Sequence, residues 1–172
     1  MSTLRMITLA VLFSLLGLGA VRAGDGQGET RTAMEQGTAY FSRGQYEMAL
    51  THYRIALSWP GEHLARAHYN IGVCHYQLGR KREAVPEYRA ALKAADGQYL
   101  KAAFALGVAW QDLGELAEAK KAFAQAVEIS RGRDAEALFQ LALLLAHRRL
   151  RNCGKALTAG DQTCAREFFR WP

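Results

Sequence analysis

Apolar and small side chains return along the chain with two periods, a short one and a long one of 35 residues. Within each long period apolar residues fall three and four positions apart, which predicts amphipathic helices. The long period is an internal repeat, which is typical of stacked helical units. Five columns of like residues carry it: Gly37, Gly72 and Gly107; Gly44, Gly79 and Gly114; Ala49, Ala84 and Ala119; Tyr53, Tyr88 and Phe123; Ala56, Ala91 and Ala126.

Each period predicts two helices joined by a tight turn. Gly44, Gly79 and Gly114 end one helical stretch and precede the next, as glycine does after a helix C-terminus. The glycine of the first column lies inside a helix, where it costs about 1 kcal/mol relative to Ala, so we expect a neighbour to pack there too closely for a Cβ. The expected helix pairs are 32–43 with 46–58, 65–78 with 83–95, and 100–113 with 116–129.

A fourth unit begins in the same way and then departs from the repeat. Asp134 is placed as the N-cap of a helix over 134–148, and Ala142 stands where the first-column glycines stood. The second-helix pattern returns about eleven residues late, as Ala165-x3-Phe169. We therefore expect an enlarged turn over 149–160 and a short final helix over 161–170 that caps the stack.

Residues 30–131 resemble tetratricopeptide repeats, a degenerate 34-residue helix pair with small and large residues at fixed places. The resemblance rests on Gly37 with Tyr40, Gly72 with His75 and Gly107 with Trp110 in the first helices, and on Ala49-x3-Tyr53, Ala84-x3-Tyr88 and Ala119-x3-Phe123 in the second. It implies an all-α, right-handed α-α superhelix of three tandem repeats over 31–133, with a degenerate fourth repeat as C-terminal cap over 134–172. The period is one residue longer than usual, and Pro86 lies within a second helix, where it kinks the helix unless it falls in the first turn.

In the repeats that this chain resembles, six positions of each unit face a concave groove lined by the first helices. Mapped onto this sequence, these positions combine a basic residue at the start of each of the first three units with an aromatic residue or Met three positions later. The groove residues so implied are Arg31, Met34, Thr38, Phe41, Arg66, Tyr69, Asn70, Val73, Tyr76, Lys101, Phe104, Val108, Gln111 and Phe139. Exposed apolar surface with Arg and aromatic residues is typical of interfaces.

The groove residues do not match the subtype of the family that binds the C-terminal carboxylates of chaperones. Family members that hold the C-terminal carboxylates of chaperones use Lys and Asn, then Asn, then Lys and Arg at five groove positions. Here those positions are Met34, Thr38, Asn70, Lys101 and Ala105, so only Asn70 and Lys101 fit. The interpretation is therefore a binding module for a peptide segment of another protein, without the carboxylate clamp.

The first 23 residues have the three parts of a secretory signal. Arg5 provides a positive start, an apolar run follows, and Val21-Arg22-Ala23 offers small residues for cleavage between Ala23 and Gly24. This predicts an exported protein, periplasmic or secreted, with residues 24–30 as a flexible leader. The apolar run is about 16 residues and a membrane-spanning helix needs about 20, so an uncleaved anchor is the alternative.

The cysteines and histidines have mainly structural interpretations. Export would favour a disulfide between Cys153 and Cys164, worth about 3 kcal/mol for a loop of this size, with two free thiols as the alternative. Cys74 lies two residues after Gly72 and is expected to be a small core residue. His68 and His75 are about 10 Å apart along one helix and are expected to pack in the core or at an interface. We expect no metal and no cofactor.

The net charge of +6 falls to about +4 once the signal is removed, a weak basis for binding nucleic acid. No arrangement of nucleophile, base and acid is recognisable, so a small enzyme is the least favoured class. The partner is expected to be another protein of the cell envelope, with the membrane reached only through the signal or that partner. The alternative is a self-assembling structural protein whose repeat stacks join end to end, as a homo-oligomer.

Overall fold

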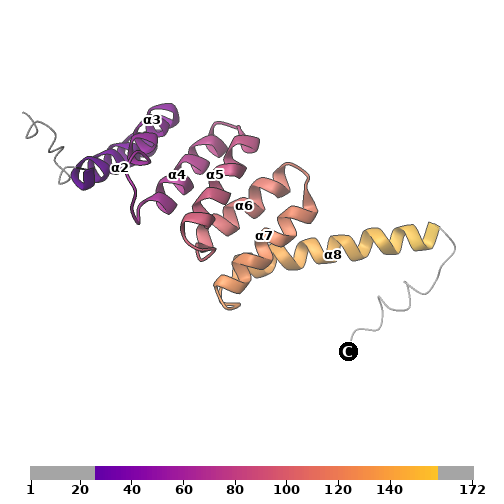
Figure 1. Cartoon of the computed structure of the whole chain (residues 1–172). Helices are drawn as coiled ribbons and strands as arrows, with labels where there is room; N and C mark the ends of the chain where they lie inside the picture. The colour runs from indigo at the N-terminus through magenta and orange to yellow at the C-terminus, as the bar shows by residue number, and fades with distance from the viewer. Residues whose placement is uncertain (1–25, 159–172) are drawn as a thin grey trace, which may run out of the picture.

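The computed structural model describes residues 26–158, with side chains over 28–147. This part contains seven helices and no strand, arranged as a row of helix pairs that ends in one long helix (Figure 1). The helices are α2 (Gly26–Ser42), α3 (Tyr46–Ala56), α4 (Leu64–Gln77), α5 (Lys81–Ala94), α6 (Leu100–Asp112), α7 (Leu116–Ile129) and α8 (Ala135–Thr158). The all-α superhelical repeat fold expected from the sequence is confirmed, and the helices of the three pairs begin and end close to the expected residues, except at the start of α2.

The turn inside each pair closes on a glycine with left-handed backbone. At Gly79 the φ angle is +75°, its N–H donates to Tyr76 O at 3.0 Å, and the N–H of Arg80 donates to His75 O at 2.9 Å. These two bonds make a Schellman motif, which satisfies carbonyls that a helix end leaves free. Gly44 and Gly114 repeat the same bonds and the same sign of φ, so the second glycine column is explained by backbone conformation.

The first glycine column is explained by contact between the two helices of a pair. A Cβ placed on Gly72 would lie 2.6 Å from Cε1 of Tyr88, which is closer than real Cβ contacts come. Gly37 meets Tyr53 and Gly107 meets Phe123 in the same way, at 2.6 and 2.7 Å. The three aromatic rings are fully buried. The close packing expected from the interior glycines is confirmed, and their helix-propensity cost is offset by the buried ring that each one admits.

Alanine lines most of the remaining interior and lets the helices approach closely. Ala49, Ala84 and Ala119, the small residues of the second helices, are completely buried. Cys74 is equally buried in the core between the first two pairs, and burial raises the pKa of its thiol to about 12. This burial confirms the expectation that Cys74 is a core residue. A thiol whose pKa is raised in this way stays protonated at neutral pH, and the thiolate is the reactive form.

The flexible leader expected over residues 24–30 is wrong for its described part. The helix α2 already begins at Gly26, ahead of the expected start at residue 32. Thr30 and Ala33 are buried, so tertiary packing extends this helix toward its N-terminus despite Gly26 and Gly28. Similarly α5 continues through Pro86, its sixth residue, so the proline does not end the helix.

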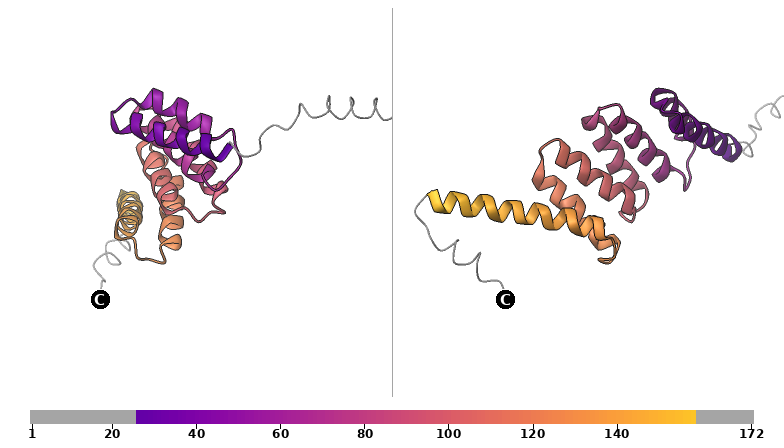
Figure 2. Two further views of the ribbon diagram at one scale, coloured as in Figure 1. Left: turned by 90° about the vertical axis from the view of Figure 1, so that its left-hand side faces the viewer. Right: turned by 180° about the vertical axis from the view of Figure 1, so that it is seen from behind.

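The enlarged turn expected over 149–160 is also wrong, because α8 is one continuous helix of 24 residues to Thr158. Its first half packs on α7, and its second half extends beyond the stack (Figure 2). The segment contains Gly154 but no Pro, and Arg, Leu, Lys and Ala predominate, so one glycine at about 1 kcal/mol does not break the helix. Asp134 caps this helix as expected, since the N–H of Ala137 donates to Asp134 Oδ1 at 2.8 Å.

Three expectations lie outside the described residues. These are the signal with its cleavage after Ala23, the final helix over 161–170, and the bridge from Cys153 to Cys164, since the side chain of Cys153 and all of Cys164 fall outside the described set. Within the described part, none of the helices has the length and apolar character that a membrane crossing requires.

Candidate functional site

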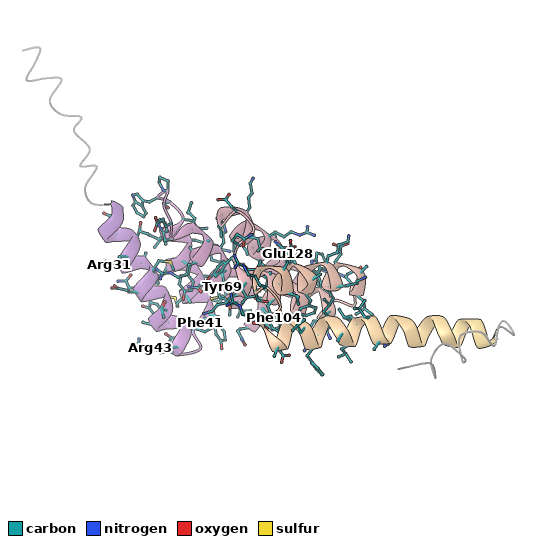
Figure 3. The ribbon with its side chains drawn as sticks, turned by 90° about the horizontal axis from the view of Figure 1, so that it is seen from below. Arg31, Phe41, Arg43, Tyr69, Phe104 and Glu128 are labelled. Carbon is teal, nitrogen blue, oxygen red and sulfur yellow. The ribbon has the colours of Figure 1, made fainter. Side chains whose placement is uncertain are left out.

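The predicted groove residues lie on α2, α4, α6 and α8, the first helices of the four units. The neighbouring first helices α4 and α6 contact each other directly, which brings successive rows of these side chains together. Figure 3 shows Arg31 and Phe41 along α2, with Tyr69 and Phe104 nearer the middle of the molecule. We call the surface formed by the predicted groove residues of these helices the first-helix surface.

Exposure divides the predicted residues into three groups. The exposed ones are Arg31, Thr38, Arg66, Lys101 and Phe139, and the half-buried ones are Phe41, Tyr69, Asn70, Val73, Tyr76, Phe104, Val108 and Gln111. Met34 is the exception, because it is 4% exposed and belongs to the core with Ala33 and Leu50. The placement of Met34 in an open groove is therefore wrong: its long flexible side chain fills space between the first two pairs.

Two rings of the surface rest directly on core rings. Tyr69 packs between Tyr88 and Tyr99, with ring centroids 6.0 and 5.4 Å away, and Phe104 meets Phe123 edge-on at 5.4 Å. Burial raises the pKa of Tyr69 above its usual value. Because Tyr69 and Phe104 each have one face in the core and remain partly exposed, they form a rigid apolar floor that is continuous with the folded interior.

Basic side chains recur on the first helices at intervals of one repeat, and Arg66 and Lys101 each stand three residues before a ring of this floor. Arg31, Arg66 and Lys101 are all exposed. Arg31 has a loose partner in Glu35, at 3.7 Å between two exposed groups, while no described carboxylate lies within ion-pairing distance of Arg66 or Lys101. The surface therefore offers positive charge that the described part of the chain leaves largely uncompensated.

A polar cluster fixes one end of the surface between the second and third units. The hydroxyl of Tyr76 donates to Asp112 Oδ2 at 2.6 Å, and Lys81 Nζ lies 2.8 Å from the same oxygen. The hydrogen bond to Asp112 raises the pKa of Tyr76 to about 12, and Lys81 and Tyr76 lower the pKa of Asp112. Sequence reasoning placed Tyr76 on the surface but missed its partners. The sequence did contain a signal for the Tyr76–Asp112 contact. The two residues are 36 positions apart, one more than the repeat length, so they stand at neighbouring places on successive first helices.

The histidines serve contacts between the two helices of the second pair. His68 Nδ1 lies 2.8 Å from Glu87 Oε2, and the buried His75 lies 3.1 Å from Glu83 Oε2, in both cases from α4 to α5. No described group of three His, Cys, Asp or Glu side chains is arranged to hold a metal ion. The interpretation of both histidines as packing residues is in line with these contacts.

A hollow at Trp110 is an alternative site. A hollow of about 320 Å³ lies between α5, α6 and α7, and its lining includes Arg89, Lys93 and Lys121. The Arg89 guanidinium stacks over the indole of Trp110 at 5.2 Å, and Lys121 pairs with Glu118 at 2.7 Å. Two of its charged groups thus already have partners within the chain, which leaves the first-helix surface as the better candidate.

Comparison with known families now identifies the repeat. Two family models, each described as Tetratricopeptide repeat, match residues 28–97 and 79–134, which together make up more than half of the chain. The chain belongs to the tetratricopeptide-repeat family. A comparison with curated proteins finds no match.

Solved structures share the fold. The second such domain of human RPAP3, in complex with the HSP70 peptide SGPTIEEVD, is 25% identical with a TM-score of 0.63, covering 69% of this chain and 97% of that one. The Sgt2 domain from Aspergillus fumigatus is 23% identical with a TM-score of 0.64, covering 72% and 82%. The Yersinia enterocolitica type III secretion chaperone SycD, in complex with a peptide of the translocator YopD, is 17% identical with a TM-score of 0.63, covering 69% and 93%.

Proposed function

We propose that this protein is a non-enzymatic interaction module that binds a peptide segment of a partner protein along the first-helix surface. The observation that carries the proposal is the alignment of exposed Arg31, Arg66 and Lys101 beside the half-buried rings of Tyr69 and Phe104. A rigid aromatic floor provides apolar burial without an ordering cost, since core rings already hold Tyr69 and Phe104 in place. The partner would supply apolar anchors together with acidic groups.

Charge complementarity supports this ligand class. Arg66 and Lys101 have no described carboxylate partner, so an acidic peptide group would meet them without displacing an existing ion pair. The human RPAP3 domain, which is similar in fold, has been solved in complex with a peptide that contains two adjacent Glu residues and ends in Asp. Because Met34, Thr38 and Ala105 replace three clamp positions, the ligand is held here by the row of aromatic and basic groups and not by a carboxylate clamp.

An array of immobilised nonapeptides of varied charge and aromatic content tests the proposal. We expect binding to peptides that combine apolar anchors with Asp or Glu, and a loss of affinity of more than tenfold in Arg66→Glu/Lys101→Glu, which is about 1.4 kcal/mol or more. Arg54→Glu/Arg82→Glu is the matched control, since it reverses two exposed charges on second helices. Equal losses in both variants would show a nonspecific charge effect, and an unchanged affinity in Arg66→Glu/Lys101→Glu would move the site off the first-helix surface.

We also propose that the module acts after export, in the cell envelope. The support is the positive start, apolar run and small-residue site over residues 1–23. Cleavage between Ala23 and Gly24 would leave α2 whole, because that helix begins at Gly26. Intact mass spectrometry of the protein from a cell fraction tests this: we expect a chain that starts at Gly24, and a chain that retains Met1 would contradict the cleaved signal.

A further inference from the structure

The helix α8 presents an apolar stripe that is exposed in the described part of the chain. Its residues are Leu138, Ala142 and Leu145, which fall one turn apart, and the two leucines are each 41% exposed. A different stripe packs against α7: Leu141 and Leu144 lie in the cluster of Phe123, and Ala137 in the cluster of Ala122 and Ala126. We call the exposed residues Leu138, Ala142 and Leu145 the outer stripe.

In every complete repeat the corresponding stripe is covered by the second helix of the same pair. In the second unit, two repeat lengths earlier in the sequence, the equivalent residues are His68, Gly72 and His75. His68 reaches Glu87 at 2.8 Å, Gly72 faces Tyr88, and His75 reaches Glu83 at 3.1 Å, so all three touch α5.

The first unit repeats this arrangement with different side chains. Its equivalent residues are Ala33, Gly37 and Tyr40. Ala33 is buried, Gly37 faces Tyr53, and Tyr40 stacks on His52 with ring centroids 5.0 Å apart, so Gly37 and Tyr40 both meet α3. The outer stripe of α8 is therefore the surface on which a second helix belongs. At the two positions where α8 has Leu138 and Leu145, the complete units have Ala33 and Tyr40, His68 and His75, and Ala103 and Trp110.

We propose that residues 159–172 return along α8 and cover the outer stripe. This segment contains Phe168, Phe169 and Trp171, and its Ala165-x3-Phe169 spacing matches the second-helix pattern of the three complete repeats. In those repeats the aromatic residue of this pattern packs on the first-column glycine. The equivalent contact in the fourth unit joins Phe169 to Ala142, with the Ala142 Cβ holding the ring farther out and the two leucines filling the added space.

The length of the segment permits this contact. From Thr158 back to Ala142 is about 24 Å at a rise of 1.5 Å per residue. Eleven residues separate Thr158 from Phe169 and span at most about 36 Å when extended. If residues 161–169 are helical, the same stretch still spans about 22 Å, which brings Phe169 level with Leu143.

The inference does not depend on the proposed peptide-binding surface, which lies on a different face of the first helices. It has its own consequence for assembly. A repeat stack needs an end whose outer face is not apolar, since neighbouring stacks otherwise join there. With its own segment on the outer stripe, the protein closes its C-terminal end and remains a monomer.

Hydrogen exchange followed by mass spectrometry on the full chain tests the proposal. In the wild type we expect the amides of residues 138–146 to exchange slowly, and in Phe168→Ser/Phe169→Ser to exchange at least tenfold faster, with unchanged helical content. The matched control is Arg166→Ser/Arg170→Ser, which makes two substitutions in the same segment without removing an aromatic ring; its exchange should stay within twofold of the wild type. Reciprocally, Leu138→Ser/Leu145→Ser should speed tryptic cleavage after Arg166 at least tenfold.

Three results would overturn the proposal. Equal exchange over 138–146 in the wild type and in Phe168→Ser/Phe169→Ser would show that the aromatic residues do not cover the stripe. Protection that disappears on dilution, together with a mass that doubles with concentration, would assign the stripe to a second copy of the chain. Protection that arises only with anionic phospholipid vesicles would assign it to a membrane surface.

Discussion

The first helix of the fourth unit follows the same residue pattern as those of the three complete repeats, but its surroundings differ. At Gly72 the helix meets the ring of Tyr88, and at the equivalent Ala142 it is exposed within the described part of the chain. At the equivalent of Phe104, which rests on Phe123, α8 has Phe139 with 60% exposure. The comparison teaches that the small first-column residue and the large second-helix residue act as a pair. Among the described residues, α8 keeps its helical structure without a second helix, and its outer stripe has no partner there.

The largest expected difference between the two regions is at their aromatic residues. Phe123→Ala removes a ring with no exposed surface and should lower the free energy of unfolding by about 3–5 kcal/mol. Phe139→Ala should change it by no more than about 0.5 kcal/mol, because the ring is mostly exposed. Urea denaturation measures both. A large loss of stability in Phe139→Ala would mean that α8 is covered on the first-helix surface, which would contradict the difference drawn here between α8 and the complete repeats.

The next largest effect concerns the glycine column. Gly72→Leu forces a side chain into the ring of Tyr88, and we expect a loss of about 1–3 kcal/mol in the free energy of unfolding. Ala142→Leu enlarges the equivalent residue of α8 and should cost less than half as much. Gln77→Leu, at an exposed position of the same helix as Gly72, controls for the introduction of a leucine. Thermal and urea denaturation measure these losses. Equal losses of stability in all three variants would show that Gly72 is not needed for the close approach of the two helices.

A smaller effect is expected at the start of α8. Asp134 accepts a hydrogen bond from the N–H of Ala137, and α3 to α7 have no side-chain cap of this kind at their N-caps. Asp134→Ala should cost about 1 kcal/mol, while Asp134→Asn should retain most of the stability. The loss should appear as faster hydrogen exchange at the start of α8, and equal losses in both variants would exclude the cap as its cause.

The smallest effect links the second and third units through pH. The pKa of Tyr76 is raised to about 12 by its hydrogen bond to Asp112, and burial raises the pKa of Tyr69 and Tyr99. An unfolded tyrosine has a pKa of about 10, so the stabilisation is present below about pH 10 and is lost as the pH rises toward 12. We expect stability, measured by urea denaturation at several pH values, to fall over this window.

Tyr76→Phe isolates the contribution of one hydroxyl to this pH dependence. It removes the group that titrates and the hydrogen bond to Asp112 but keeps the ring under Lys81. Its stability should fall less steeply between pH 10 and 12 than that of the wild type. An identical slope in both proteins would assign the alkaline loss to the buried groups, which are the tyrosines and Cys74, whose thiol pKa burial also raises to about 12.

Most of the repeat could be read from the sequence because its causes are local and recur. A glycine with positive φ follows each first helix, and another glycine inside that helix faces a buried ring. Both requirements recur in every unit, so both columns can be recognised as glycines that repeat every 35 residues. The candidate surface was only partly predictable. Met34 shares its column with Tyr69 and Phe104, yet it is in the core, because its long flexible side chain fills space between the first two pairs.

The sequence by itself determined which residues share a helix face and, apart from the start of α2, where the helices of the three pairs begin and end. Hydrophobic spacing and turn chemistry act over a few residues, which is why they can be read locally. The sequence could not determine which faces would be covered. Two features that only the tertiary structure decided are the half-burial of Tyr69 between Tyr88 and Tyr99 and the contact of Tyr76 with Asp112. Burial and pairing depend on what packs opposite a face, and that partner comes from another unit of the chain.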